Sequence, residues 1–361
     1  MPATPWMLLE TKAAHLARFE SVGLKLPERR LTSRELMAST RHETNIDLER
    51  LTGIRERRVC SEGEDSLTLA VDAARDCLSR SRYAGADLDM VICASITHYT
   101  GRSTNRLEPP LSLSIKKAIG AHAATSFDLS NACAGMLTGV FVLNDFIRRG
   151  AIRRGMVVSG EFISGLGTNA AREIRSIFSG QLASLTLGDA GAAVIVDRAP
   201  DGAAGIALAG FTTISRHSRL CLGMPAPHTP GARMFTRARK IHRVAMQDAP
   251  SLLEDVLRES GLRLADLDWV IPHQTSARAI RAGERELAAH FGEHPKHMVI
   301  NVEDFGNTSS TTHFVALHRY LTEGRFQRGD KVLLLALASG LEIGVILLVM
   351  DELVETHGHT H

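Results

Sequence analysis

The chain has 361 residues, of which 44% are hydrophobic and 23% are charged, and its formal net charge is +2. This is the composition of a globular protein with a large core, and the near balance of charge argues against a dedicated nucleic-acid-binding protein. The length suits two fused units or one large α/β body.

The cysteines are few, odd in number and widely spaced, and no CxxC pair occurs; they are Cys60, Cys77, Cys93, Cys133 and Cys221. This excludes a disulfide framework and a cysteine-based zinc site, so we expect the protein in a reducing cytoplasm. Charges at Glu10, Lys12 and Arg18 come too early for a secretory signal.

The chain contains two copies of one pattern. ADLDMVICAS at 86–95 and ADLDWVIPHQ at 265–274 are identical at six of ten positions. An amphipathic helix pattern precedes each copy, and a turn of small residues follows each, NACAG at 131–135 and GNTSS at 306–310. Alternating strands and helices predict largely parallel sheets covered by helices.

The repeat divides the chain into an N-terminal half at 1–200 and a C-terminal half at 201–361. The glycine-rich segment APDGAAG at 199–205 is the expected surface crossing between them. The apolar stretch 332–350 is interrupted by Glu342 and two glycines, so it predicts two buried strands around a tight turn and not a membrane span.

Cys133 is the first candidate for chemistry. It follows a strand pattern at 124–130 and precedes a helix pattern that includes Leu137, Val140 and Ile147. The N–H groups at the start of a helix favour a thiolate, and the small neighbours leave room for a substrate. A buried free cysteine is also a common small hydrophobe, which is our interpretation of the other four.

His273 and Asn307 are the other two candidates. His273 ends the strand of the second copy, and Asn307 lies in the turn that corresponds to NACAG. If the two halves face each other across a pseudo-twofold axis, Cys133, His273 and Asn307 should come together. A lone histidine at a strand end and a Gly-Asn turn are also ordinary structural features.

Two glycine-containing segments remain, GDAGAAV at 188–194 and ASGLEIG at 338–344. Both predict tight turns next to strands, and the phosphate-loop pattern GxxxxGK[ST] is absent. A backbone N–H at such a turn can serve an oxyanion. The histidines of HGHTH at 357–361 suggest a frayed tail more than a metal site, and we predict no resident metal.

NACAG, IPHQTSAR, GNTSS and ASGLEIG, in this order, resemble the motifs of the ketoacyl synthase III branch of the thiolase-like condensing enzymes. LTGIRERRV at 51–59 and GDAGAAV resemble two more of its motifs, and the similarity runs from about residue 45 to about residue 350. The resemblance implies a duplicated α/β fold, with two mixed sheets and helices in α-β-α-β-α layers.

The resemblance also implies roles for the candidates. Cys133 would be the acyl-accepting nucleophile of a ping-pong Claisen condensation. His273 and Asn307 would bind the second thioester, and the N–H groups of Cys133 and Gly340 would form an oxyanion hole. Acyl-CoA or a phosphopantetheinyl carrier protein would be the substrate, with no further cofactor, and the protein would be a homodimer in fatty acid or polyketide biosynthesis.

The chain departs from the family pattern at two places. NIDLERLTG has no aromatic residue where fatty-acid members usually carry a tryptophan that stacks on the CoA adenine, which favours a carrier-protein donor. ASGLEIG replaces GGGFTWG, so a short acetyl primer is not implied. Candidates for binding the substrate or an acidic carrier helix are Arg243, Arg278, Arg281 and Ser339.

The loop 97–120 is longer than in fatty-acid starters and leaves alternatives open. Glu108 resembles a glutamate of the long-chain, head-to-head condensing relatives, where it crosses the dimer interface. It would act as a base if burial raised its pKa, and it is otherwise a surface carboxylate before two prolines. The remaining alternatives are acyl transfer to a hydroxyl or amine, and a non-enzymatic partner subunit. The unusual loop favours specialised metabolism.

Overall fold

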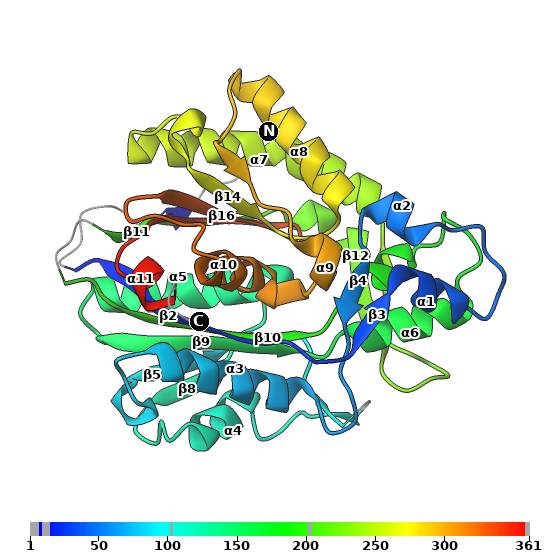
Figure 1. Cartoon of the computed structure of the whole chain (residues 1–361), viewed down its shortest axis with the longest axis horizontal. Helices are drawn as coiled ribbons and strands as arrows, with labels where there is room; N and C mark the ends of the chain where they lie inside the picture. Colours follow the sequence, from blue (N-terminus) through cyan, green and yellow to red (C-terminus); the bar gives the residue numbers. More distant parts are fainter. Residues whose placement is uncertain (1–6, 9–14, 102–103, 201–203, 358–361) are drawn as a thin grey trace.

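The computed structural model describes residues 7–8, 15–101, 104–200 and 204–357. Its centre is a pair of stacked sheets with helices outside and between them (Figure 1). The first sheet has the order β2 (Ala17–Lys25), β10 (Ala190–Arg198), β9 (Arg154–Glu161), β5 (Met90–Cys93) and β8 (Thr125–Asp128). Strand β5 is parallel to β8 and β9, whereas β10 is antiparallel to both β9 and β2.

The second sheet repeats the first. Its order is β1 (Met7–Leu8), β11 (Gly205–Thr213), β17 (Glu342–Val349), β16 (Lys331–Ala338), β14 (Trp269–Pro272) and β15 (His297–Met298). Strand β14 is parallel to β15 and β16, and the other pairs are antiparallel. Apart from the added β1, order and direction match strand for strand, which confirms the duplication predicted from the two ADLD segments.

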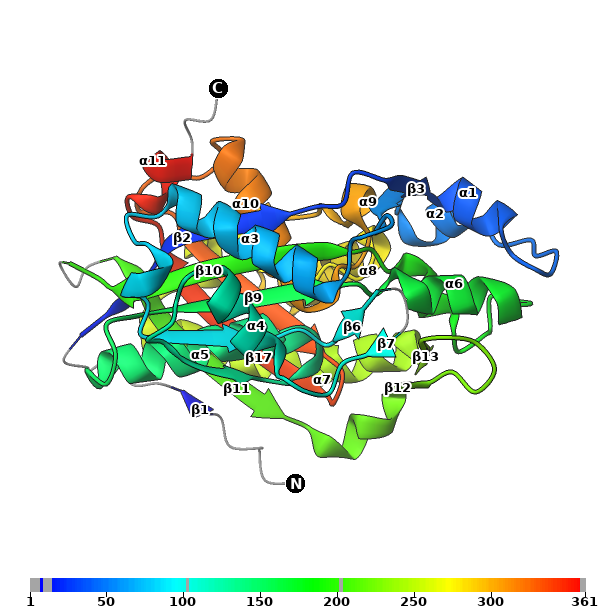
Figure 2. The same cartoon turned by 90° about the horizontal axis from the view of Figure 1, so that it is seen from below.

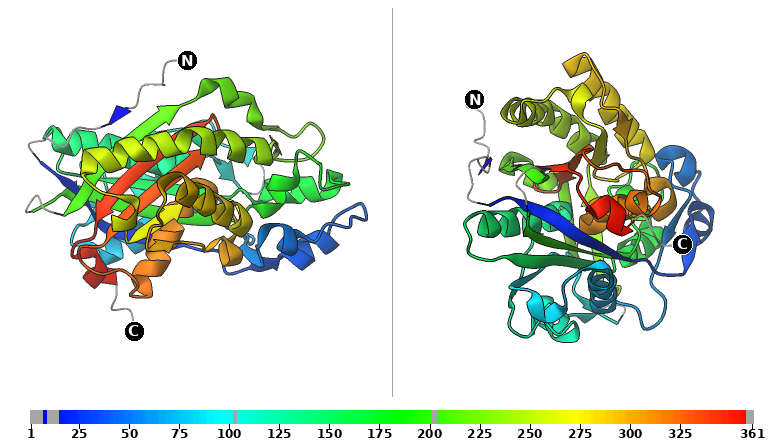
Figure 3. Two further views of the ribbon diagram at one scale, coloured as in Figure 1. Left: turned by 90° about the horizontal axis from the view of Figure 1, so that it is seen from above. Right: turned by 60° about the vertical axis from the view of Figure 1, so that its left-hand side comes forward.

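The helices form three layers. Helices α3 (Ser66–Arg80) and α4 (Leu111–Ala118) cover the outer face of the first sheet, and α7 (Ala238–Ser260) and α8 (Ala277–Phe291) cover the second (Figures 1 and 3). Helices α5 (Gly135–Arg148) and α10 (Thr312–Thr322) lie between the sheets. Their side chains form the central core with both sheets, so the predicted α-β-α-β-α layering is confirmed.

The smaller elements lie mostly at one end of the sheets, where several form an extension (Figure 2). The extension contains β3 (Arg30–Thr32), α1 (Ser33–Ala38), α2 (Leu48–Thr52), β4 (Glu56–Arg58), α6 (Ser164–Glu173), β12 (Cys221–Pro225) and β13 (Ala232–Thr236). The remaining short elements are β6 (Tyr99–Thr100), β7 (Thr104–Asn105), α9 (Val302–Phe305) and α11 (Leu353–His357).

Three sequence expectations concern the later part of the chain. Strands β16 and β17 are the two buried strands predicted at 332–350, and within the described ranges no helix is long and apolar enough to cross a membrane. The division near residue 200 falls between β10 and β11 and stays a prediction. The predicted frayed tail is wrong at its first residue: His357 is buried because α11 packs against β2, and the rest of the tail lies outside the described residues.

Candidate active site

Cys133 lies in a 3-10 turn, Ala132–Ala134, between β8 and α5, as the strand and helix patterns predicted. Ala132 has a φ of 45°, which is uncommon for a residue with a side chain. Gly135 begins α5 so close to β5 that a Cβ there would lie 2.9 Å from the Ala94 carbonyl oxygen. Close packing therefore keeps the turn in this strained conformation, with the cysteine at its tip.

Burial, and not the helix start, dominates the ionisation of Cys133. Desolvation raises the pKa of its thiol to about 12, although a contact with Ser309 opposes the rise. The expectation of a thiolate is therefore wrong for the resting protein. The helix N-terminus is too weak to offset the removal of the sulfur from water.

The second turn faces the first. The Sγ atom of Cys133 lies 3.6 Å from the Oγ atom of Ser309, in the 3-10 turn Ser309–Thr311 that precedes α10. Gly306, with a φ of 67°, turns the chain where a Cβ would come within 2.7 Å of the Thr186 carbonyl oxygen. This confirms that NACAG and GNTSS meet across the two halves.

Asn307 is fixed by its backbone. Its N–H donates to the Thr186 carbonyl oxygen at 2.8 Å, and its own carbonyl oxygen accepts the N–H of Gly188 at 3.0 Å. Its Oδ1 atom accepts the N–H of Ser309 at 2.9 Å, which leaves the amide NH₂ group as a donor. GDAGAAV thus supports the GNTSS turn through its first glycine.

His273 follows β14 and is 5% exposed. Its backbone N–H donates to the Leu335 carbonyl oxygen at 2.9 Å. Burial, together with the neighbouring His313, lowers the pKa of His273 to about 3. The ring is therefore neutral at pH 7 and offers one donor and one acceptor.

A buried carboxyl group that the sequence analysis missed connects the halves. Glu161, at the end of β9, accepts the N–H of Ile96 at 2.9 Å and the Oγ1–H of Thr97 at 3.0 Å. Ser310 of the second half donates to the same carboxyl group and lies 2.8 Å from the Oγ atom of Ser159. Burial raises the pKa of Glu161. The sequence feature that could have indicated Glu161 is a single acidic residue at the end of an apolar strand pattern.

The structure thus brings together the segments that carry Cys133, His273 and Asn307. Cys133 touches the residue two positions after Asn307, and His273 lies beside α10, which starts from the same turn. Among the described residues no hydrogen bond joins the three side chains to one another. Their catalytic roles remain predictions.

The other candidates lie around this centre. Gly340, with a φ of 137°, and Ser339 form the turn between β16 and β17, and both strands contact the Cys133 turn. Glu108 is exposed in the loop between β7 and α4. Arg243 is exposed on α7 and Arg278 and Arg281 on α8, and Arg281 pairs with Glu303 at 3.0 Å.

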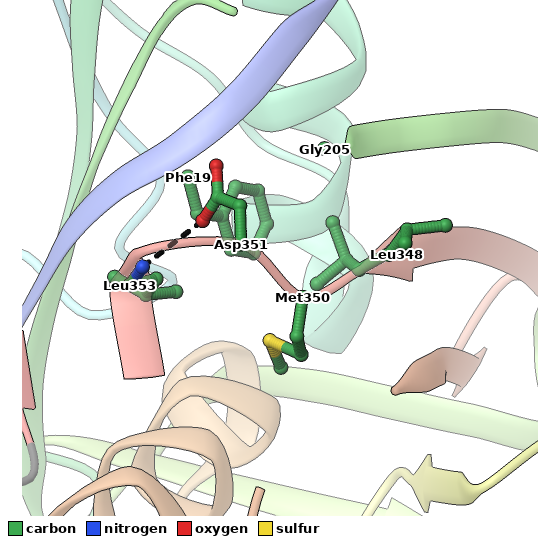
Figure 4. Close-up of a pocket in the computed structure, with 7 residues that line it drawn as sticks. Phe19, Gly205, Leu348, Met350, Asp351 and Leu353 are labelled. Atoms are coloured by element: carbon green, nitrogen blue, oxygen red, sulfur yellow. Dashed lines mark hydrogen bonds between the residues drawn. The ribbon is translucent and has the colours of Figure 1, made fainter. Parts of the chain in front are cut away.

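A hollow at the end of β17 is separate from these residues (Figure 4). Phe19, Leu348 and Met350 line it, and the carboxylate of Asp351 accepts the N–H of Leu353 at 3.0 Å. None of the candidate residues lines it. Over the described part of the chain, no group of three or more His, Cys, Asp or Glu side chains could hold a metal ion.

Comparison with known proteins places this site in a family. Residues 127–213 match the model of 3-oxoacyl-[acyl-carrier-protein (ACP)] synthase III, and residues 257–350 match its C-terminal model. A beta-ketoacyl-[acyl-carrier-protein] synthase III of Symbiobacterium thermophilum is 30% identical over 345 residues, which cover 91% of this chain and 96% of the relative. The corresponding enzyme of Deinococcus deserti is 32% identical over 333 residues, which cover 89% of this chain and 87% of the relative.

Solved structures agree in fold. 3-Oxoacyl-[acyl-carrier-protein] synthase III from Aquifex aeolicus has a TM-score of 0.77 at 25% identity, covering 92% of this chain and all (100%) of that one. A variant of OleA from Xanthomonas campestris has a TM-score of 0.80 at 21% identity, covering 94% of this chain and 99% of that one. The priming β-ketosynthase of the R1128 polyketide pathway has a TM-score of 0.78 at 24% identity, covering 95% of this chain and 98% of that one.

A duplicated pair of mixed sheets, with a cysteine turn facing an Asn-bearing turn at their junction, defines a thiolase-like condensing enzyme. Such a protein is a transferase that moves acyl groups and forms carbon–carbon bonds. The chain belongs to the 3-oxoacyl-[acyl-carrier-protein] synthase III family, which confirms the resemblance identified from the motifs.

Proposed function

We propose that this enzyme loads an acyl group from a thioester onto Cys133 and then joins it to a second acyl thioester, with a malonyl-carrier protein as the leading candidate. The observation that carries the proposal is the contact between the Cys133 thiol and the turn that presents Asn307. Family membership supports a phosphopantetheinyl carrier protein or CoA as the acyl carrier. No further cofactor is needed for this chemistry.

In the first half-reaction, the sulfur of Cys133 attacks the thioester carbonyl carbon, and the bond from that carbon to the donor's sulfur breaks. The thiol proton of Cys133 is transferred to the departing thiolate, which leaves as a free thiol. The backbone N–H groups of Cys133 and Gly340 are the donors proposed for the oxyanion. Loss of one such donor typically costs about 2.7–4 kcal/mol of transition-state stabilisation.

In the second half-reaction, a malonyl thioester loses CO₂ and leaves an enolate whose carbon attacks the acyl-cysteine. The NH₂ group of Asn307 is free to donate to the thioester oxygen, and neutral His273 adds no charge to the site. The bond from the acyl carbon to the Cys133 sulfur breaks, the sulfur leaves as a thiolate that takes up a proton from water, and the product stays on the carrier of the second substrate. A role in a specialised pathway, as for the R1128 ketosynthase, is part of the proposal.

A second candidate is head-to-head condensation of two longer acyl chains. It is favoured by the fold shared with OleA and by the loop 104–110, whose tip carries Glu108 and a Leu107 that is 81% exposed. An apolar side chain so exposed fits a homodimer in which a second copy covers the loop. Glu108 would then serve the partner's site as a base. Acyl transfer to a hydroxyl or amine is less favoured, because it leaves Asn307 without a purpose.

Intact-protein mass spectrometry tests the loading step. The protein is incubated with acyl-CoAs and acyl-carrier proteins of increasing chain length, with Cys133→Ala as the control. We expect an acyl adduct on the wild type alone, and the donor that loads best identifies the first substrate. If no donor loads the wild type, the proposal is wrong and a non-catalytic partner subunit becomes the better explanation.

Two variants distinguish the two candidate reactions for the second step. Asn307→Asp should still load but lose malonyl decarboxylation, because a carboxylate cannot donate to the thioester oxygen. Glu108→Ala should lose only condensation that proceeds without a malonyl group. A monomer by light scattering would rule out the cross-subunit role of Glu108.

A further inference from the structure

The proposed reaction gives no role to the LTGIRERRV segment, although its residues contact the second half of the chain. The backbone N–H of Arg55 donates to the Glu303 carbonyl oxygen at 2.8 Å, and the two side chains form an ion pair at 3.1 Å. Ile54 is buried and shares a small core cluster with Val302, in the same short helix α9 as Glu303. Because α9 leads directly into the turn that carries Asn307, this segment of the first half lies beside the site.

Arg57 of this segment is buried although it carries a charge. Its exposed fraction is 0%, and among the described residues no carboxylate pairs with it. Burial lowers the pKa of Arg57 to about 10, so the guanidinium is still charged at pH 7. Burying a charge without an opposite charge is unfavourable, so the hydrogen bonds of the guanidinium have to offset that cost.

The hydrogen bonds of Arg57 go to two separate parts of the chain. Its Nη2 atom donates to the Leu185 carbonyl oxygen and to the Oγ atom of Ser33, both at 3.1 Å. Its Nη1 atom donates to the Leu31 carbonyl oxygen at 3.4 Å. Ser33 and Leu31 belong to the extension, in α1 and β3. One guanidinium therefore ties α1 and β3 to the segment around Leu185.

The residues that follow in that segment hold the backbone of Asn307. Thr186 accepts the N–H of Asn307 at 2.8 Å, and the N–H of Gly188 donates to the Asn307 carbonyl oxygen at 3.0 Å. The stem of Arg57 packs beside both turns: a Cβ at Gly188 would lie 2.9 Å from the Cβ of Arg57, and a Cβ at Gly306 would lie 3.0 Å from it. The same side chain thus bonds the segment that holds Asn307 and packs against the glycine before Asn307.

We propose that Arg57 is a positioning residue that fixes the place of Asn307, so that the NH₂ group of Asn307 reaches the oxygen of the second thioester. The inference rests on the proposed function, because it concerns the residue that binds the malonyl thioester there. Arg57 itself touches no substrate. Its influence is on the second half-reaction, since none of its hydrogen bonds goes to the turn that carries Cys133.

The first test compares two arginine-to-lysine variants in the same segment. Arg57→Lys keeps the charge, but the single nitrogen of lysine lacks the planar fork with which the guanidinium bonds two segments at once. Arg58→Lys is the matched control. Arg58 donates to the carbonyl oxygens of Pro27 and Glu28, at 3.0 and 3.4 Å, in the loop between β2 and β3.

The readout is the ratio of malonyl-thioester decarboxylation to acyl loading on Cys133. In Arg57→Lys the ratio should fall roughly tenfold to a hundredfold, because a displacement of about 1 Å caused by a substitution away from the chemistry can cost on the order of a hundredfold in rate. The kcat of decarboxylation should fall with little change in KM, since Asn307 acts on the developing enolate. The ratio in Arg58→Lys should equal that of the wild type.

The ratio separates positioning from stability. A smaller amount of folded protein lowers loading and decarboxylation in the same proportion and leaves the ratio unchanged. An unchanged ratio in folded Arg57→Lys would therefore overturn the proposal, and so would an equal fall in Arg58→Lys. Failure of the proposed function is seen in the wild type itself, as absence of loading on Cys133 or of malonyl decarboxylation.

A milder variant decides the question if Arg57→Lys does not fold. Ser33→Ala removes one acceptor of the guanidinium and should lower the ratio by a smaller factor than Arg57→Lys. Its control is Ser39→Ala at the other end of α1, where the hydroxyl donates only to the Leu36 carbonyl oxygen, at 2.7 Å. Equal ratios in Ser33→Ala, Ser39→Ala and the wild type would show that Asn307 keeps its place without these bonds, and the proposal would be wrong.

Discussion

At the scale of single residues, burial outweighs local helix electrostatics at Cys133. A charge at a helix terminus is worth about 0.3–1 kcal/mol, and at most about 2 kcal/mol in favourable geometry. Desolvation raises the pKa of the thiol from 9.0 to about 12, which corresponds to about 4 kcal/mol. The resting nucleophile is therefore a thiol, and its proton must leave during the loading step.

The first prediction concerns the reactivity of this thiol. Without substrate, alkylation of Cys133 by iodoacetamide should become roughly tenfold faster per pH unit between about pH 7 and pH 9, because the thiolate fraction rises tenfold per unit below the pKa. Peptide mass spectrometry measures the rate at Cys133, and Cys133→Ala identifies labelling at other cysteines. A rate that levels off below pH 9 would show that the pKa of the thiol lies below that pH and would contradict the prediction.

At the scale of elements, glycines let α3 lie directly on the first sheet. A Cβ at Gly160 of β9 would lie 2.0 Å from the Ser66 carbonyl oxygen, and a Cβ at Gly191 of β10 would lie 2.1 Å from that of Leu69. Both obstacles are helix backbone, which cannot move aside as a side chain can. The glycines therefore set the distance between this helix and the strands that lead to the site.

The second prediction is that Gly191→Ala lowers the free energy of unfolding by about 1–3 kcal/mol or more, because the added methyl group overpacks the helix–sheet contact. The matched control is Gly165→Ala in α6, where a Cβ meets nothing within 4 Å. It should be neutral or stabilising by up to about 1 kcal/mol. Urea unfolding followed by circular dichroism measures both, and equal midpoints for the two variants would refute the idea.

Local patterns predicted several elements closely. The strand expected at 124–130 is β8, the helix after Cys133 is α5, and ASGLEIG joins β16 to β17. They were predictable because periodicity and turn residues act over a few positions. The pairing of β1 with β11 was not, because it joins residues about 200 positions apart that carry no shared pattern.

At the scale of the whole molecule, a buried charge cluster connects the two halves. Arg18 of β2 donates to Asp197 of β10 at 2.9 Å and to Asp351, just after β17, at 3.2 Å. The side chains of Arg18 and Asp197 are 3% and 2% exposed. The cluster links the segment that follows β17 to β2, the edge strand of the first sheet.

The third prediction is that Arg18→Met lowers the free energy of unfolding by about 3–5 kcal/mol, because it removes one partner of the buried Arg18–Asp197 ion pair. Arg328→Met is the control: Arg328 pairs with Glu355 at 3.0 Å, but both side chains are more than half exposed. That loss should cost less than about 1 kcal/mol. Denaturant titration compares the two variants. Similar losses in the free energy of unfolding would show that the buried cluster contributes no more to stability than the exposed pair.

The sequence by itself determined the duplication, the order of the motifs and the place of Cys133 between a strand and a helix, because these depend on neighbours and on repeats along the chain. Only the tertiary structure decided that Ser309 lies against Cys133, 176 positions away, that Glu161 binds Ser310, and that His313 lies beside His273. It also decided the protonation of Cys133 and His273. Desolvation depends on what the whole fold packs around a group, and no local pattern carries that information.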